Sequence, residues 1–371
     1  MGMIQKKISA KLNKYPLIKG IFSFACHPLL KCANYRKLKQ YSEKISVLPE
    51  FKNTDYSMWR ESFNTLISLS NEVRFIDMIE EFYKESLTLL KYNSFKDDDI
   101  IVVCLLKNEI YRVREFVKHY RSLGADGFVF IDNGSDDGTV EFLMEQSDIA
   151  LFKTRTTYNS IRKTAWINKA ISYFGLNRWY IIPDSDEFFV YPEMDEMNLH
   201  EYLSALKQKG IYGVKTMMLE MYPNAPFFDD KADPSLFRYT YRFYDKDALF
   251  LTRVFGDDCS DVRPKPTVLF YDGSRFAVGS HDYFPFAENQ SSDYGGIVLH
   301  YKFLPHERHK IDKIVESGVY ANHSALYKLY KNRFDNDSEY NAFYEGSLEW
   351  RGTESISDFD FIKRLTSLNE K

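Results

Sequence analysis

Three acidic residues directly follow an apolar segment near the middle of the chain. Trp179 to Ile182 has the composition of a buried strand, and Pro183 ends it because proline cannot donate a backbone hydrogen bond. Asp184, Asp186 and Glu187 come next, and a second apolar segment follows at once. Carboxylates between apolar segments cost free energy unless a cation pairs with them. Asp184 and Asp186 can both reach one oxygen-preferring ion such as Mg²⁺ or Mn²⁺; the alternative is a solvated acidic turn.

The segments around these acids alternate between strand and helix patterns. This alternation predicts an α/β fold with a mostly parallel sheet, flanked by helices and joined by right-handed crossovers. Ligands bind such sheets at the carboxyl ends of the strands, where polar clusters stand at 107–109, 132–139 and 184–187. We therefore expect these clusters to share one edge. The expected strands are Ile100–Leu106, Phe128–Ile131, Ile149–Lys153 and Trp179–Ile182, and the expected helices are Arg112–Leu123, Val140–Gln146 and Ile161–Phe174.

Composition and charge limit the classes to which this chain can belong. Its 371 residues are 44% hydrophobic, enough for a large core, and the net charge of −4 gives no general case for nucleic-acid binding. No apolar run reaches the length of a membrane span. The four cysteines form no C-x-x-C pair, which is typical of reduced thiols, so the expected location is the cytoplasm.

The N-terminal segment 1–42 is strongly basic. It holds nine Lys or Arg residues and no acidic residue, and Ile4, Ile8, Leu12 and Tyr15 follow the spacing of one helical face. Basic amphipathic helices bind anionic membrane surfaces, which predicts peripheral contact with the inner face of the membrane. The alternative is a helix that docks on the acidic body of the same protein.

Three regions are expected along the chain. Residues 1–96 form a helical N-terminal region, in which Tyr56 to Leu90 predicts two helices broken near Ser70. Residues 97–320 form the α/β domain that carries the acids. Residues 321–371 form a C-terminal tail that is partly helical.

Five short segments stand in a specific order and spacing, although each is a weak signal alone. They are Cys104–Glu109, Arg114–Phe116 with Gly124, Phe130–Thr139, Asp184–Phe188 and Leu299–Tyr301. Together they resemble the family-2-like glycosyltransferases of the GT-A fold, in the branch common in bacterial surface-polysaccharide gene clusters. The resemblance covers about Ile100 to Phe303 and leaves the N-terminal helices and the C-terminal tail outside.

The resemblance implies a nucleotide-sugar donor bound at this edge of the sheet. In this family the corresponding turns hold the nucleoside, which implies roles for Asn108, Glu109 and Asp132. The alternative for Asp132 is that it caps its own turn. Lys169, on the helix after the third strand, is expected to line the donor cleft.

The resemblance also implies a divalent metal, Mn²⁺ or Mg²⁺. By analogy Asp186 is the direct ligand, Asp184 holds the ribose or a metal-bound water, and His300 completes the site from a late strand. An isolated histidine at a strand end is alternatively structural.

An inverting transfer also needs a base for the acceptor hydroxyl, and that base must come from the chain beyond the acidic turn. Asp282 is favoured, because it stands in a tight turn beside aromatic residues that would raise its pKa. The alternative is a surface Asp in a turn. The full set of candidates is Glu220, Asp257, Asp258, His281 and Asp282.

These features predict a metal-dependent glycosyltransferase that moves a sugar, expected to be UDP-linked, to a surface glycan such as capsule or lipopolysaccharide. A processive synthase is not expected, because no Q-x-x-R-W motif follows the acids. One alternative is a nucleotidyltransferase with paired Asp residues, although the loop 107–109 lacks the glycine of that class. Another is a non-catalytic, carbohydrate-binding descendant of the fold, against which the intact Asp184, Asp186 and His300 argue.

Overall fold

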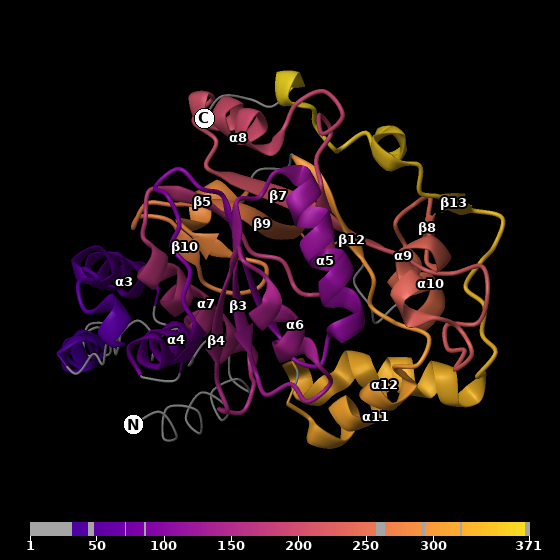
Figure 1. Cartoon of the computed structure of the whole chain (residues 1–371), viewed down its shortest axis with the longest axis horizontal. Helices are drawn as coiled ribbons and strands as arrows, with labels where there is room; N and C mark the ends of the chain where they lie inside the picture. Colours follow the sequence, from indigo (N-terminus) through magenta and orange to yellow (C-terminus); the bar gives the residue numbers. More distant parts are fainter. Residues whose placement is uncertain are drawn as a thin grey trace, which may run out of the picture.

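A large sheet forms the centre of the molecule, and helices cover both of its faces (Figure 1). The predicted α/β fold is therefore confirmed, and the arrangement is consistent with a GT-A-like fold. In the part of the chain that the structure describes, every helix is too short or too polar to cross a membrane. This computed structural model describes residues 32–43, 48–70, 72–84, 87–256, 264–290, 294–319 and 321–367, so most of the basic segment lies outside the described residues.

Within the described ranges the central sheet has nine strands, and most of them share one direction. All run the same way except β1, β6 and β9, which pair antiparallel with their neighbours. The carboxyl ends of the other strands therefore lie along one edge, as the sequence predicts. In spatial order the strands are β1 (Thr88–Lys91), β4 (Ile149–Lys153), β3 (Gly127–Asp132), β2 (Ile101–Leu106), β5 (Arg178–Ile181), β9 (Pro264–Tyr271), β7 (Gly213–Glu220), β12 (Gly296–His300) and β6 (Glu187–Val190).

Strand β2 is apolar throughout because both of its faces are covered. Val102 lies in the core cluster under α5 (Ile110–Leu123) and α8 (Leu199–Gln208), whereas Ile101 lies in the cluster under α7 (Ser160–Phe174). Gly124 ends α5 in the left-handed conformation, with φ of 98°, as glycine does at helix ends.

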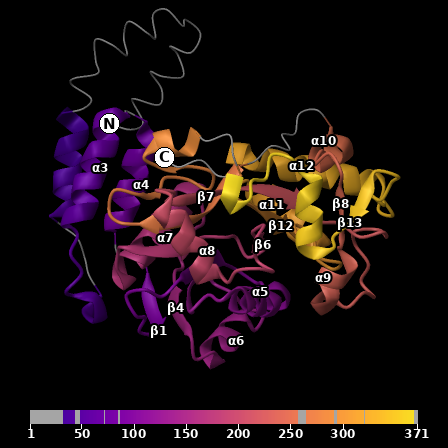
Figure 2. The same ribbon diagram turned by 90° about the horizontal axis from the view of Figure 1, so that it is seen from above.

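The N-terminal helices pack on the α7 side of the sheet, and Figures 1 and 2 show them together at one side of the molecule. They are α3 (Ser57–Leu69) and α4 (Val73–Tyr83), so the predicted break near Ser70 is confirmed. An aromatic cluster joins them: the Phe82 ring centroid lies 5.0 Å from that of Trp59 and 5.1 Å from that of Phe63.

The predicted helical pattern extends too far at its end. Leu90 lies in β1, an edge strand that pairs antiparallel with β4, so the chain enters the sheet before residue 97. Its apolar side chain also fits the spacing of the helical stripe, and a four-residue strand is too short to show its own period.

Residues 308–349 pack against the middle of the chain on the opposite side of the molecule from α3 and α4 (Figure 2). Strand β13 (Ser347–Glu349) pairs with β8 (Phe243–Asp245), and α11 (Arg308–Ser317) packs on α12 (Ala321–Asn336). The structure also contains α6 (Thr139–Glu145), α9 (Phe237–Thr240), α10 (Phe250–Phe255), β10 (Phe276–Ala277) and β11 (Tyr283–Phe284).

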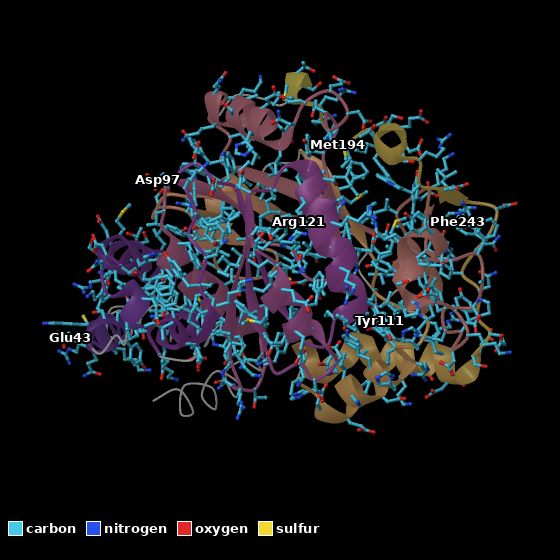
Figure 3. The ribbon with its side chains drawn as sticks, in the orientation of Figure 1. Glu43, Asp97, Tyr111, Arg121, Met194 and Phe243 are labelled. Carbon is cyan, nitrogen blue, oxygen red and sulfur yellow. The ribbon has the colours of Figure 1, made fainter. Side chains whose placement is uncertain are left out.

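Helix α5 crosses the free edge of β6. Tyr120 donates from its hydroxyl to the carbonyl of Glu187 (3.0 Å) and accepts from the Phe189 N–H (3.1 Å), while His119 Nε2 lies 2.8 Å from the Phe189 carbonyl. Burial lowers the pKa of His119 to about 3, so the ring is neutral. Figure 3 labels Tyr111 and Arg121, which mark the two ends of this helix.

Phe82→Ala is expected to lower the free energy of unfolding by about 3–5 kcal/mol, because the fully buried ring would leave a cavity between α3, α4 and α7. Leu69→Ala is the control: this side chain is 69% exposed, so its removal should change stability by less than about 0.5 kcal/mol. Urea titration followed by circular dichroism measures both. Equal urea unfolding midpoints for the two variants would contradict the packing of α3 and α4 in one hydrophobic core with α7.

Candidate active site

Three titratable side chains stand in one row at the carboxyl edge of the sheet. Strand register places His300 of β12 opposite Glu187 of β6 on one side and Glu220 of β7 on the other. His300 Nδ1 lies 2.8 Å from Glu220 Oε2, and Nε2 lies 3.2 Å from Asp186 Oδ2. Burial alone would lower the pKa of His300, but the carboxylates of Glu220 and Asp186 outweigh burial and raise the pKa to about 10. The ring is thus an imidazolium that donates to both carboxylates.

The acidic turn gathers three carboxylates. Asp184, Asp186 and Glu187 each offer an oxygen within 4.8 Å of the other two. Carboxylate oxygens are the donors that Mg²⁺ and Mn²⁺ prefer, so the set can hold such an ion. Asp184 and Asp186 are the ligands predicted from the sequence, and the structure adds Glu187 to them. His300 reaches Asp186, and both of its ring nitrogens face carboxylates.

Each acid of this cluster also has a lysine partner. Lys163 of α7 pairs with Asp184, and Lys265 of β9 pairs with Glu187 and lies 3.3 Å from Asp184 Oδ2. Lys302 Nζ lies 3.5 Å from Asp186 Oδ2. Burial opposes ionisation of Asp184, but Lys163 and Lys265 outweigh it and hold its pKa well below the ordinary value. None of the three lysines was predicted, because their partners lie far away in the sequence.

Lys169, predicted to line the donor cleft, lies elsewhere. It is 2% exposed, and its Nζ lies 5.0 Å from the ring centroid of Tyr56, 5.4 Å from that of Tyr173 and 5.5 Å from that of Phe82. These rings belong to α7 and the N-terminal region that packs on it. Lys163, on the same helix, is the lysine that reaches the acids.

Asp132 is bound to its own turn. Its carboxylate is fully buried and accepts hydrogen bonds from the N–H groups of Gly134 and Ser135, both at 3.0 Å. Asn108 joins this turn to the loop after β2, since its side chain exchanges two hydrogen bonds with Asp136. The two turns predicted to hold the nucleoside are therefore connected and adjacent.

Glu109 is engaged in a buried ionic network. Its carboxylate accepts from Arg112 Nη1 at 2.8 Å and from Lys310 Nζ at 2.6 Å. Arg112 also donates to both carboxylate oxygens of Glu307, at 2.8 and 2.6 Å. The network fastens the start of α5 to α11.

Arg112 also holds the chain beyond β12. Its Nε donates to the Tyr301 carbonyl and its Nη2 to the Lys302 carbonyl, each at 3.1 Å. The side chains of His300 and Lys302, in this same segment, both contact Asp186. Arg112 therefore helps to fix these two side chains beside the acidic turn.

The base candidates lie in different surroundings. Asp282 is partly exposed in the turn between β10 and β11, whose Gly279 and Ser280 line a pocket together with Lys163 and Lys265. Glu220 is 9% exposed and bound to His300. His281 Nδ1 lies 3.0 Å from the Pro264 carbonyl. Asp257 and Asp258 lie outside the described residues.

Comparisons with known proteins find similarity to this chain among solved structures. No protein-family model matches it, and no curated protein matches. Among solved structures it is similar to residues 1–349 of TarS from S. aureus, at 12% identity, over 65% of this chain and 72% of that one. The TM-score is 0.29, which carries no argument about the function.

Glu307→Gln is expected to destabilise the protein by about 3–5 kcal/mol at pH 7, because it leaves the buried Arg112 without its bidentate partner. Burial would raise the pKa of Glu307, but Arg112 and Lys310 outweigh burial and lower the pKa from 4.5 to about 2. A depressed carboxyl pKa stabilises the fold above the unfolded value and loses that effect as the pH falls toward the folded value.

The difference in unfolding midpoint between wild type and Glu307→Gln should therefore narrow as the pH falls below about 4.5. Chemical denaturation at a series of pH values measures it. Glu316→Gln, an exposed change on the same helix, is the control and should follow the wild type throughout. A difference that stays constant down to about pH 3 would contradict the assigned ionisation.

Proposed function

We propose that this protein is a metal-dependent glycosyltransferase that takes a sugar from a nucleotide-sugar donor, with UDP as the expected nucleotide. The observation that supports this proposal most is the carboxylate cluster of Asp184, Asp186 and Glu187 at the carboxyl edge of the sheet. Ligands of open α/β sheets bind at this edge, and buried lysines beside the acids suit an anionic substrate. The proposed acceptor class, a surface glycan such as capsule or lipopolysaccharide, rests on the family resemblance.

The residues of the acidic turn have distinct proposed tasks. Asp184, Asp186 and Glu187 would hold Mg²⁺ or Mn²⁺, which when bound neutralises a diphosphate and stabilises it as a leaving group. His300 orients Asp186, and Glu220 in turn keeps His300 charged and fixed. This division leaves His300 as a positioning residue rather than a direct ligand.

The nucleoside is proposed to bind beside the connected turns after β2 and β3. Asn108 offers a partly exposed amide there. Asp132 and Glu109 are buried and already bonded, so their proposed role is to shape this surface rather than to contact the base.

The acceptor hydroxyl needs a base on the side of the sugar away from the diphosphate. We assign this role to Asp282, whose partly exposed carboxyl is available, while the Glu220 carboxylate is committed to His300. Gly279 and Ser280 of the turn that carries Asp282 line a pocket together with Lys163 and Lys265, which supports this assignment.

Asp186→Asn is expected to lower the rate of sugar transfer about a thousandfold, which corresponds to about 4 kcal/mol of transition-state stabilisation, because a neutral amide is a poor ligand for the metal. Release of UDP from a panel of UDP-sugars, with Mn²⁺ or with EDTA, measures the rate. Asp312→Asn, a partly exposed change on α11, is the control and should retain the wild-type rate. Full activity in EDTA would contradict the metal requirement.

Asp282→Asn is expected to abolish transfer but to leave metal-dependent donor binding intact, because the base acts on the acceptor and not on the donor. Glu220→Gln is the comparison and should weaken metal binding through His300. Isothermal titration for binding and product analysis for transfer separate the two effects. Transfer that survives in Asp282→Asn, or a product that keeps the anomeric configuration of the donor, would remove Asp282 from this role.

A further inference from the structure

A small cavity beside the acidic turn has no part in the proposed metal site. Its volume is about 20 Å³, slightly more than one water molecule needs. Most of the side chains that line it are apolar, and these are Ile167, Ile182, Pro266, Leu269 and Ala277. Water finds few hydrogen-bond partners between such walls, whereas an apolar group gains contacts with them. The cavity therefore suits a group about as large as a methyl group.

Two further lining residues connect the cavity to the acidic turn. Lys163 and Lys265 both line it, and their ammonium groups contact Asp184 and Glu187 respectively. One side chain thus separates the cavity from the carboxylates that are proposed to hold the metal.

The cavity is also lined by the turn that carries the proposed base. Gly279 and Ser280 line it, and Asp282 follows them in the same turn between β10 and β11. A sugar in transfer lies between its diphosphate leaving group and the base that activates the acceptor. Because the cavity adjoins both the acidic turn and the turn of Asp282, a substituent of that sugar can reach it.

Two hydroxyl groups interrupt the apolar lining. Thr164 Oγ1 donates to the Ser160 carbonyl at 3.2 Å, and a hydroxyl that donates keeps its capacity to accept. The hydroxyl-bearing side chain of Ser280 also lines the cavity. An acetamido group combines a methyl group with an amide that can bond to hydroxyls, so it matches this mixed lining.

We propose that this cavity is a specificity pocket for a methyl group carried by the transferred sugar, an inference that rests on the proposed function. The methyl group belongs either to an acetamido substituent or to C6 of a 6-deoxy sugar. A plain hexose leaves the cavity unfilled and forgoes these contacts. The pocket thus selects among donors that share the same nucleotide.

The test is isothermal titration of the full chain in saturating Mn²⁺ with matched nucleotide sugars. UDP-glucose is compared with UDP-N-acetylglucosamine and with UDP-6-deoxyglucose, and UDP-galactose is compared with UDP-N-acetylgalactosamine. At least one methyl-bearing donor should bind about tenfold more tightly than its plain hexose partner, which is the usual discrimination by a small apolar pocket. The pairs distinguish an acetamido group from a C6 methyl group. Equal or weaker binding of every methyl-bearing donor would overturn the proposal.

Gly279→Leu is expected to abolish this preference by filling the cavity. A Cβ atom at Gly279 meets no other atom within 4 Å, so the protein has room for the new side chain. The variant should bind the preferred donor about as weakly as its plain hexose partner, and it should bind UDP with wild-type affinity. Gly279→Ala should show a smaller loss in the same direction.

Ala277→Val fills the cavity from β10 and is the second variant. Ser122→Leu, an exposed change on α5, is the control and should leave every affinity unchanged. Unchanged UDP binding shows that a variant is folded. A full preference for the methyl-bearing donor in both Gly279→Leu and Ala277→Val would overturn the assignment of this cavity.

The outcomes separate this inference from the function on which it rests. If the wild type binds the nucleotide sugars but does not distinguish the matched donors, the specificity pocket fails and the proposed function stands. If the wild type binds none of the nucleotide sugars, with or without Mn²⁺, the proposed function fails, and the specificity pocket fails with it.

Discussion

Charge compensation among buried side chains is the constraint on which the candidate site depends. The acids arrive together on one turn, but their partners come from α7, β9 and the end of β12. A buried charge that loses its partner is strongly destabilising, so the turn can be buried only when these three elements are in place. Strand register is what brings them there, because it sets His300 beside Glu187 and Glu220. The buried acids therefore have their partners only when the strands of the sheet pair in this order.

A second layer of charge supports the first. Arg112 is 1% exposed and binds two carboxylates and two carbonyls, so its guanidinium is satisfied by groups from α5, α11 and the chain after β12. The planar, forked donor geometry of arginine suits this task, and lysine would not reproduce it. By binding the carbonyls of Tyr301 and Lys302, Arg112 fixes the segment whose His300 and Lys302 side chains contact Asp186.

The sequence predicts those parts of the structure that follow from local patterns. The apolar run of β2, the glycine end of α5 and the acids after β5 all have signals within a few residues, and each is where it was expected. Leu90 has no such signal, because the pairing of β1 with β4 is a tertiary contact. The grouping of 107–109, 132–139 and the acidic turn at one edge followed from the rule for parallel strands.

Lys163 and Lys169 show where the prediction stops. The sequence predicts their helix and its place beside the cleft, but not which of its faces meets the acids. At 3.6 residues per turn, six residues separate two side chains by about 240° around the helix, so only one of the pair can face the cleft. Which lysine faces the cleft depends on the rotation of α7 about its own axis. That rotation is set by packing against α3 and α4 and cannot be read from the sequence of α7 alone. For the same reason the sequence does not show that Glu109 has a partner on α11.

The edge strand β6 has a further consequence for how copies of this protein meet. An exposed edge normally offers unpaired N–H and C=O groups to a strand from another chain, which is the route to β-augmentation and to sheet-mediated aggregation. Here side chains of His119 and Tyr120 occupy the outward groups of Glu187 and Phe189. Side chains of α5 thereby make hydrogen bonds that a further strand would make to β6. We therefore expect β6 not to pair with a strand from another molecule.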